Sequence, residues 1–339
     1  MQITTLEEPY LLFGTGKHVD IRYGLRNFCP LDFDCESAPK KIRLGVVGDS
    51  KSIEELKDWL EKCRGEIEAK KSHQRNLFPN WPGFNTESVF FSELQFDSSL
   101  ERQISSSDIK TISSLAVRDE QIIRAVDLIV AEVQLLLEKK PDVIACAIPQ
   151  ELLEALNPGD QSNNLDDDED IEKDKKATLD FHHLLKAKCM TLPRACPIQL
   201  VLPATYNSKY KRRGRSRKDI RPLQDEATRA WNFHTALYYK AGGIPWKLQE
   251  DSTKLQTCFV GVGFYKTLDQ ERILTSVAQV FNERGNGVVV RGEQAIYEKE
   301  DRQIHLEIKQ QTFCKFPGPS VSVISIKLSG ISCRFPSRR

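Results

Sequence analysis

The spacing of hydrophobic residues predicts alternating strands and helices over the first part of the chain. Apolar residues are nearly continuous in KKIRLGVVGDS (40–50) and PDVIACAIP (141–149), which is typical of buried strands. Between them, apolar residues recur every three or four positions from Ser52, a candidate helix cap, and again over 117–139, which predicts two helices. With a further strand expected at 88–96, this alternation predicts an α/β fold with a parallel sheet covered by helices.

The first 38 residues show a different pattern. Proline and glycine recur at short intervals, at Pro9, Gly14, Gly16, Gly24 and Pro30. Because these residues interrupt regular elements, we expect only short strands and turns here. A segment of this length cannot bury a core of its own, so we expect it to pack on a later domain.

Composition places the chain among globular proteins of about two domains. Its 339 residues are 40% hydrophobic and 29% charged. No apolar run reaches the roughly 18 residues of a membrane helix, and the first residues show no signal pattern. We therefore expect a cytoplasmic protein without a membrane partner. The 9 cysteines form no CxxC pair, which favours reduced thiols over a zinc site or a disulfide framework.

Charge is distributed unevenly, although the net charge is only +1. Residues 157–177 are polar and acidic, and we expect a flexible loop there. The run KYKRRGRSRK (209–218) is strongly basic, and its Gly and Ser predict a loop. Such a loop suits a nucleic-acid backbone, although a solvated basic linker remains an alternative. The candidate backbone contacts are Lys209, Lys211, Arg212, Arg213, Arg215, Arg217 and Arg229.

A candidate anion site opens with FHHLLKAK (181–188), which is expected to be helical. His182 and Lys186 stand four residues apart and therefore share one face. The opposite face, with Phe181, Leu184, Leu185 and Met190, is expected to enter the core. An imidazole beside an ammonium group suits a terminal phosphate, and the ring can also stack on a base.

Two later residues can join this site. Gln199 stands between Ile198 and Leu200 in a short predicted strand, so it points away from these apolar neighbours. Lys240 lies in the last turn of a predicted helix that ends at Gly242-Gly243. Each residue alone has an ordinary structural explanation; a lysine at a helix C-terminus, for example, interacts favourably with the helix dipole.

Four stretches together resemble the short prokaryotic Argonautes, which carry only MID and PIWI domains. The resemblance extends to about Pro319. The stretches are EEPYLLFGTGKHVDIRYGLRNFCPLDFD (7–34), IRLGVVGDSKSIEELKDWLEKCRGEI (42–67) with the loop LFPNWPGFN, DVIACAIPQELLE (142–154), and TRAWNFHTALYYKAGGIPWKL (228–248).

The resemblance implies N-terminal strands at 1–38, a Rossmann-like MID domain at 39–243 and the first part of an RNase H-like PIWI domain at 244–339. In that family the MID pocket holds the 5′ phosphate of a guide strand. His182, Lys186, Gln199 and Lys240 stand at the matching positions. A second lysine is expected where this chain has Ala236, so that contact is missing or is supplied by Arg229 or the basic loop. No cofactor is established; a Mg²⁺ ion at the 5′ phosphate is the one candidate.

The PIWI part departs from the pattern of cleaving Argonautes. The resemblance places their first catalytic acid in the strand TCFVGVGFYK (257–266), at the position of Gly263. Two-metal hydrolysis needs carboxylate ligands, which glycine lacks. We therefore expect no catalytic residues and no metal site, and a surface position for Glu293. A guide-directed endonuclease remains the alternative.

The chain also changes character after Pro319. The last 20 residues contain no acidic residue and depart from the expected PIWI continuation from about residue 320. We interpret this as a change of reading frame near residues 317–322, which the downstream DNA would reveal. A non-functional truncated fragment is the corresponding alternative.

The resemblance favours a guide-dependent recognition subunit in prokaryotic defence against plasmids or phage. It implies a short guide, RNA or alternatively DNA, and a complementary target, expected to be DNA. It also implies a separate effector with an APAZ region fused to a sirtuin-like, TIR or nuclease domain. Sequence-independent nucleic-acid binding through residues 209–221 is a further alternative, which predicts a steep dependence on salt.

Overall fold

A computed structural model describes most of the first 249 residues and the backbone of six later strands. The chain forms two compact units, Met1–Leu248 and Gln249–Arg339. The sequence predicts a boundary after residue 243. The first unit extends further because β8 (Lys247–Leu248) pairs with β1 (Leu11–Leu12). The described ranges are 8–73, 77–156, 179–208, 210 and 223–249, with the strands of the second unit given below.

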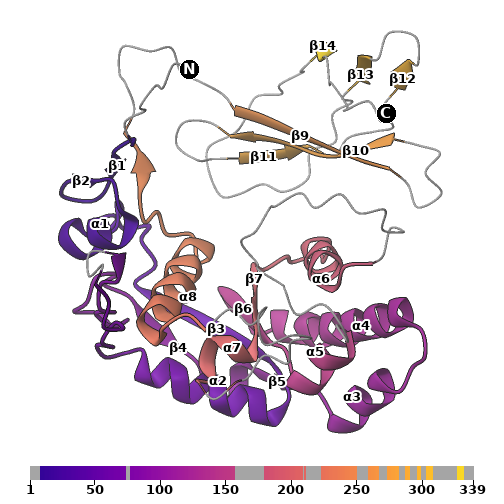
Figure 1. The fold of residues 1–339 in the computed structure, drawn as a ribbon, viewed down its shortest axis with the longest axis horizontal. Helices are drawn as coiled ribbons and strands as arrows, with labels where there is room; N and C mark the ends of the chain where they lie inside the picture. The colour runs from indigo at the N-terminus through magenta and orange to yellow at the C-terminus, as the bar shows by residue number, and fades with distance from the viewer. Residues whose placement is uncertain are drawn as a thin grey trace. The chain divides into compact units, whose positions relative to one another are not determined.

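A five-stranded parallel sheet forms the centre of the first unit (Figure 1). Its order is β4-β3-β6-β7, and β5 pairs with the same edge of β3 as β4. The strands after β3 are therefore added first on one side of it, as β4 and β5, and then on the other side, as β6 and β7. This is the arrangement of a doubly wound α/β fold. The strands are β3 (Lys41–Gly48), β4 (Glu93–Gln95), β5 (Glu101–Gln103), β6 (Val143–Ala147) and β7 (Ile198–Val201).

Helices cover both faces of this sheet. Alternate residues of β3 enter different cores: Leu44 and Val46 pack with α2 and α8, and Val47 packs with α3, α4, α5 and α6. The predicted α/β class is thus confirmed in the first unit. The helices are α2 (Ser50–Lys62), α3 (Ser106–Ser113), α4 (Arg118–Leu137), α5 (Gln150–Leu156), α6 (Phe181–Met190), α7 (Pro203–Tyr206) and α8 (Glu226–Lys240).

Two local predictions were wrong. The N-cap of α2 is Asp49, not Ser52: its Oδ1 accepts a hydrogen bond from the Ser52 amide at 3.1 Å. The strand expected at 88–96 is confined to β4, because Phe91 has a positive φ of 49° that interrupts extended backbone.

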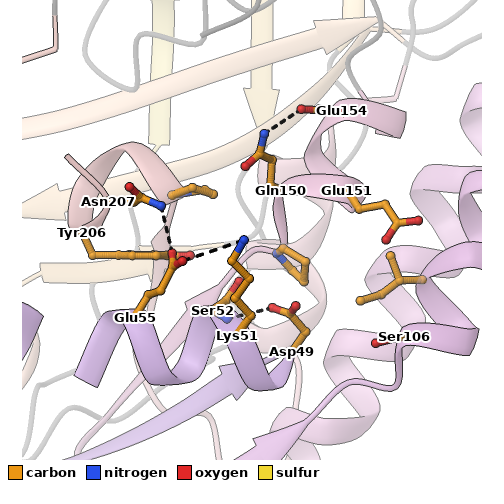
Figure 2. A pocket seen from close by; sticks show the side chains of 13 residues that line it. Asp49, Lys51, Ser52, Glu55, Ser106, Gln150, Glu151, Glu154, Tyr206 and Asn207 are labelled. Atoms are coloured by element: carbon orange, nitrogen blue, oxygen red, sulfur yellow. Dashed lines mark hydrogen bonds and ion pairs between the residues drawn. The ribbon is translucent and has the colours of Figure 1, made fainter. Parts of the chain in front are cut away.

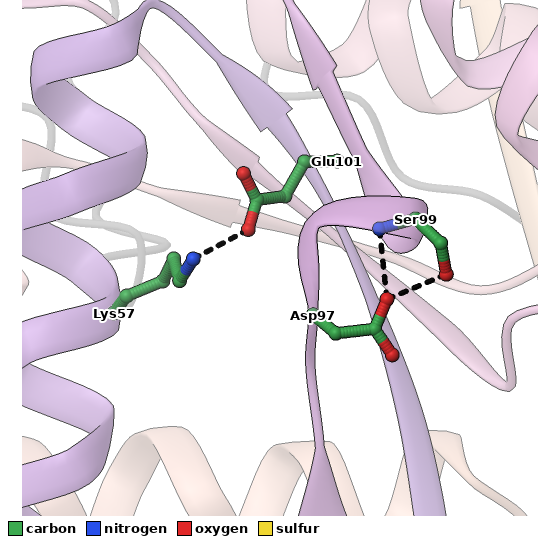
Figure 3. A network of polar contacts seen from close by, with 4 residues as sticks. All are labelled: Lys57, Asp97, Ser99 and Glu101. Atoms are coloured by element: carbon green, nitrogen blue, oxygen red, sulfur yellow. Dashed lines mark hydrogen bonds and ion pairs between the residues drawn. The ribbon is translucent and has the colours of Figure 1, made fainter.

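Polar contacts fix the segment that follows β4 (Figure 3). Asp97 accepts a hydrogen bond from the Ser99 amide at 2.8 Å and starts the short helix η2 (Ser98–Leu100). Lys57 Nζ then lies 2.6 Å from Glu101 Oε1, which links α2 to β5. These contacts set where β5 joins β3 beside α2.

The N-terminal segment contains a helix that its glycine content did not predict. Helix α1 (Ile21–Phe28) follows the strand β2 (Lys17–His18) and is capped by Asp20, which accepts from the Tyr23 amide at 2.9 Å. Gly24 lies inside this helix, and a Cβ there would be 2.0 Å from the Phe13 ring. The glycine therefore permits close helix packing, and reading it as a helix breaker was wrong.

A buried carboxylate joins this segment to the end of α8. Asp32 is 4% exposed and accepts hydrogen bonds at 2.8 Å from the Tyr238 hydroxyl and from the Ile244 amide. Because these contacts lie on both sides of the helix end, they fix the position of the last turn of α8. The N-terminal segment thus packs against the end of α8.

The second unit contains two three-stranded antiparallel sheets, with orders β11-β10-β9 and β12-β13-β14. Gly263 lies in β9 and pairs with Val277. The final strand, β14, lies within the segment after residue 320. The strands are β9 (Phe259–Lys266), β10 (Ile273–Phe281), β11 (Gly287–Val290), β12 (Ile296–Glu298), β13 (Gln303–Glu307) and β14 (Lys327–Ile331). Among the described helices of the whole chain, none is both long and apolar enough to cross a membrane.

A histidine lies at the centre of the aromatic core beneath α8. The His234 ring is fully buried, 4.8 Å from the Trp81 ring and 5.1 Å from the Phe84 ring between centroids. Its Nδ1 donates to the Ala230 carbonyl at 2.9 Å. Burial lowers the pKa of His234 to about 4. The imidazole is therefore neutral in the folded protein at neutral pH.

This burial predicts loss of stability in mild acid. Between the ordinary histidine pKa of about 6.5 and about 4, the unfolded chain binds a proton that the folded chain does not. The free energy of unfolding should fall by about 3 kcal/mol over this range because of His234 alone. Urea unfolding of the wild type and of His234→Phe, from pH 7 to pH 4.5, measures this effect. The variant should show a shallower pH dependence; an unchanged slope would contradict the assignment.

Candidate functional site

Helix α6 holds His182 and Lys186 on one side and buries the other. Asp180 caps the helix by accepting from the His183 amide at 2.7 Å. Phe181, Leu185 and Cys189 are buried and Leu184 packs against the same core. The expectation that Met190 enters the core was wrong: it is 65% exposed, because it is the last helical residue before the chain turns away. Neither Asp180 nor His183 was predicted as a site residue from the sequence.

Gln199 lies on β7, the edge strand of the described sheet on the side of α6. Its neighbours Ile198 and Leu200 are buried against the core that contains α4 and α6. Gln199 points to the opposite face, where its Oε1 accepts a hydrogen bond from Lys240 Nζ. The predicted orientation of this side chain is therefore confirmed. Figure 1 shows β7 in the interval between α6 and the end of α8.

The end of α8 places Lys240 at this edge. Gly242 has a φ of 94°, which favours glycine and ends the helix. A Cβ on Gly243 would lie 2.3 Å from the Tyr238 ring, so the second glycine is needed for the chain to fold back over the helix. The two glycines thus end the helix directly after the turn that carries Lys240.

The charges of these residues influence one another. The pKa of Lys240 is lowered to about 8, first by burial and then by the charge of Lys186. The pKa of His182 is also lowered, first by burial and then by Lys186, with a smaller effect of Lys240. All four side chains are half-buried. The structure therefore brings together His182, Lys186, Gln199 and Lys240 from α6, β7 and α8.

The positive charge of this cluster comes from Lys186 and Lys240. Among the described residues, neither Lys186 nor Lys240 forms an ion pair, whereas Lys188 on the same helix pairs with Asp127. Two ammonium groups, an amide and a neutral imidazole are suited to binding a compact dianion.

Arg229 does not belong to this surface, which corrects the sequence prediction. It is 7% exposed, and its Nη1 donates to the carbonyls of Ala204 at 3.0 Å and Thr205 at 2.6 Å. It therefore anchors α8 to α7 and does not replace the lysine missing at Ala236. The other candidate backbone residues lie outside the described residues: Lys209, Lys211, Arg212, Arg213, Arg215 and Arg217.

A hollow lies beyond the carboxyl ends of β3, β5, β6 and β7 (Figure 2). It has a volume of about 340 Å³ and is lined by Asp49, Glu55, Glu151 and Glu154, with Lys51 as the basic residue. Lys51 Nζ is 3.9 Å from Glu55 Oε1, so part of its charge is already offset. This acidic lining repels phosphate, so the hollow is less suited to an anion than the cluster around Lys186 and Lys240.

Replacement of Lys240 by an apolar residue should stabilise the free protein. A half-buried ammonium beside Lys186 disfavours the folded state below pH 8, where it stays protonated. Lys240→Met should raise the Tm at pH 7 by roughly 2–4 °C, the shift expected for about 1 kcal/mol after solvent screening. The gain should shrink from pH 8 to pH 10, since wild-type Lys240 is then neutral in the folded state. Differential scanning calorimetry of the wild type and Lys240→Met at pH 7 and at pH 10 measures this effect. A lower Tm of the variant than of the wild type at pH 7 would contradict the prediction.

Comparison with known proteins gives structural similarity only. No protein-family model and no curated protein sequence matches the chain. Drosophila Piwi is similar in structure, with 13% identity and a TM-score of 0.45, over 85% of this chain and 29% of Piwi. Marinitoga piezophila Argonaute, in complex with a 5′ OH guide RNA, gives 9% identity and a TM-score of 0.40, over 86% of this chain and 34% of that protein. The chain thus corresponds to about a third of the length of these proteins.

Proposed function

We propose that the first unit binds the 5′ end of a nucleic-acid strand through its terminal phosphate. The observation that carries this proposal is the position of Lys240. Lys240 Nζ donates a hydrogen bond to Gln199 Oε1 on the edge strand, and the pKa of Lys240 is lowered by burial and by the charge of Lys186. A half-buried lysine beside a second lysine is electrostatically unfavourable without an anion. A bound phosphate would relieve this repulsion.

A terminal phosphate fits better than an internal one. A terminal phosphate monoester carries up to two negative charges, which matches two lysines, whereas an internal diester carries one. His182 has a lowered pKa and is therefore neutral at pH 7. It can donate a hydrogen bond to the phosphate or stack on the first base without adding a third positive charge.

The wider role follows from the resemblance of the sequence to short Argonautes. We propose that the bound strand is a short guide, RNA in preference to DNA, which pairs with a complementary DNA target. Target pairing would then activate a separate APAZ-containing effector in defence against plasmids or phage. The basic segment 209–218 would contact the backbone of the guide or target.

Target cleavage by this chain is not part of the proposal, because Gly263 supplies no carboxylate. The alternative, a guide-directed endonuclease, is tested with a labelled, guide-matched target and Mg²⁺ or Mn²⁺. Cleavage that requires the matching guide would replace the recognition role with an enzymatic one. An intact target together with guide-dependent target binding would support the recognition role.

The pocket predicts a preference for phosphorylated ends. Lys186→Ala and Lys240→Ala should each weaken binding of a 5′-phosphorylated RNA about tenfold or more, the value of one charged hydrogen bond of roughly 1.5–3 kcal/mol. Binding of the same RNA with a 5′ hydroxyl should change little. Fluorescence anisotropy at fixed salt measures all of these affinities.

Lys188→Ala is the matched control, since Lys188 lies on the same helix but is paired with Asp127. It should leave the preference for the phosphate unchanged. Equal losses for phosphorylated and hydroxyl RNA in the Lys186 and Lys240 variants would contradict the pocket. They would instead favour sequence-independent binding through the basic segment.

A further inference from the structure

Three side chains capable of metal binding meet at the start of α6. Asp180, His182 and His183 each offer a ligand atom, and these atoms lie within 4.8 Å of one another. His183 Nδ1 is 3.1 Å from Asp180 Oδ1, and the two imidazole centroids are 5.4 Å apart. The proposed phosphate pocket shares His182 with this cluster but uses neither Asp180 nor His183, so the cluster lies at the rim of the pocket.

The kinds of ligand select the class of ion. Two imidazoles and a carboxylate are typical of Zn²⁺ and neighbouring divalent transition metals, with distances near 2.0–2.2 Å for Zn²⁺. Mg²⁺ prefers oxygen ligands and is disfavoured by two nitrogens. Three protein ligands leave at least one coordination position for water or an anion.

The side chains can reach metal-binding distances at little cost. The His183 and Asp180 side chains are 82% and 54% exposed, so they can turn without losing buried contacts. His182 is half-buried and offers a ring nitrogen within 4.8 Å of the ligand atoms of Asp180 and His183. The hydrogen bond that Asp180 accepts from the His183 amide holds Asp180 beside the helix when no ion is bound.

Two positive charges near the cluster disfavour a cation and therefore favour an anion as the fourth ligand. The N-terminus of α6 carries a partial positive charge, and Lys186 adds a full one nearby. The single carboxylate of Asp180 offsets only part of this charge. An anionic ligand in the open position would offset more of it, so binding of the ion should be stronger when an anion is available.

We propose that Asp180, His182 and His183 form a binding site for one divalent transition-metal ion of the Zn²⁺ class. The site does not depend on the proposed binding of nucleic acid. The ion would be held at the beginning of α6 with an open coordination position at the edge of the phosphate pocket. Its presence would fix the orientation of His182.

The test uses the full chain without a histidine tag and with reduced thiols. Zn²⁺ is titrated calorimetrically, and Co²⁺ reports ligand geometry through its visible absorption. His183→Ala and Asp180→Asn should each lower the affinity for Zn²⁺ at least about tenfold and weaken the Co²⁺ bands. Asparagine retains the cap of α6, so Asp180→Asn isolates the ligand from the fold. His73→Ala, which removes an exposed histidine elsewhere, should change nothing.

Zn²⁺ affinity that is equal in the wild type, His183→Ala and Asp180→Asn would overturn the proposal, as would the same losses in His73→Ala. The outcome is separable from that of the phosphate pocket. In metal-free buffer, Asp180→Asn and His183→Ala should keep the wild-type preference for a 5′-phosphorylated RNA. If only the Lys186 and Lys240 variants lose that preference, the result supports the phosphate pocket and is independent of the metal site.

Discussion

The contact between Lys240 and Gln199 is the constraint on which the candidate site depends. It joins the last turn of α8 to the edge strand of the parallel sheet, between two helices that cover opposite faces. The charge of Lys186 on α6 helps to lower the pKa of Lys240, and the charges of both lysines help to lower the pKa of His182. This hydrogen bond joins α8 to β7, and the packing of α6 on the sheet adds Lys186 and His182 to the same positively charged group.

The surrounding structure makes this placement possible. The buried carboxylate of Asp32 holds both Tyr238 and the backbone after Gly243, so the end of α8 cannot shift freely. Arg229 anchors the first turns of the same helix to α7. Helix α8 is therefore fixed at both ends, and its aromatic core around His234 fills the space beneath it. The N-terminal segment, distant in sequence, thus contributes to the position of Lys240.

Much of the first unit could be predicted from periodicity. The strands β3, β6 and β7 and the helices α2, α4, α6 and α8 follow from apolar spacing because each buries a well-defined face. Helix α1 could not be predicted because it depends on tertiary packing around Gly24. The shortening of β4 could not be predicted because it depends on one positive φ angle, at Phe91. Periodicity also could not show that Arg229 points inward, because its partners are backbone carbonyls.

The candidate site was predictable in its membership but not in its physical state. Spacing and the family resemblance selected His182, Lys186, Gln199 and Lys240, whereas the lowered pKa of Lys240 follows only from its burial in the fold. That pKa is the most direct measure of the account. NMR titration of the Lys240 side chain should give a value near 8 in the free protein. The value should rise on binding a 5′-phosphorylated RNA and stay unchanged with a 5′-hydroxyl RNA. An ordinary lysine pKa of about 10.4 that neither RNA changes would contradict the account.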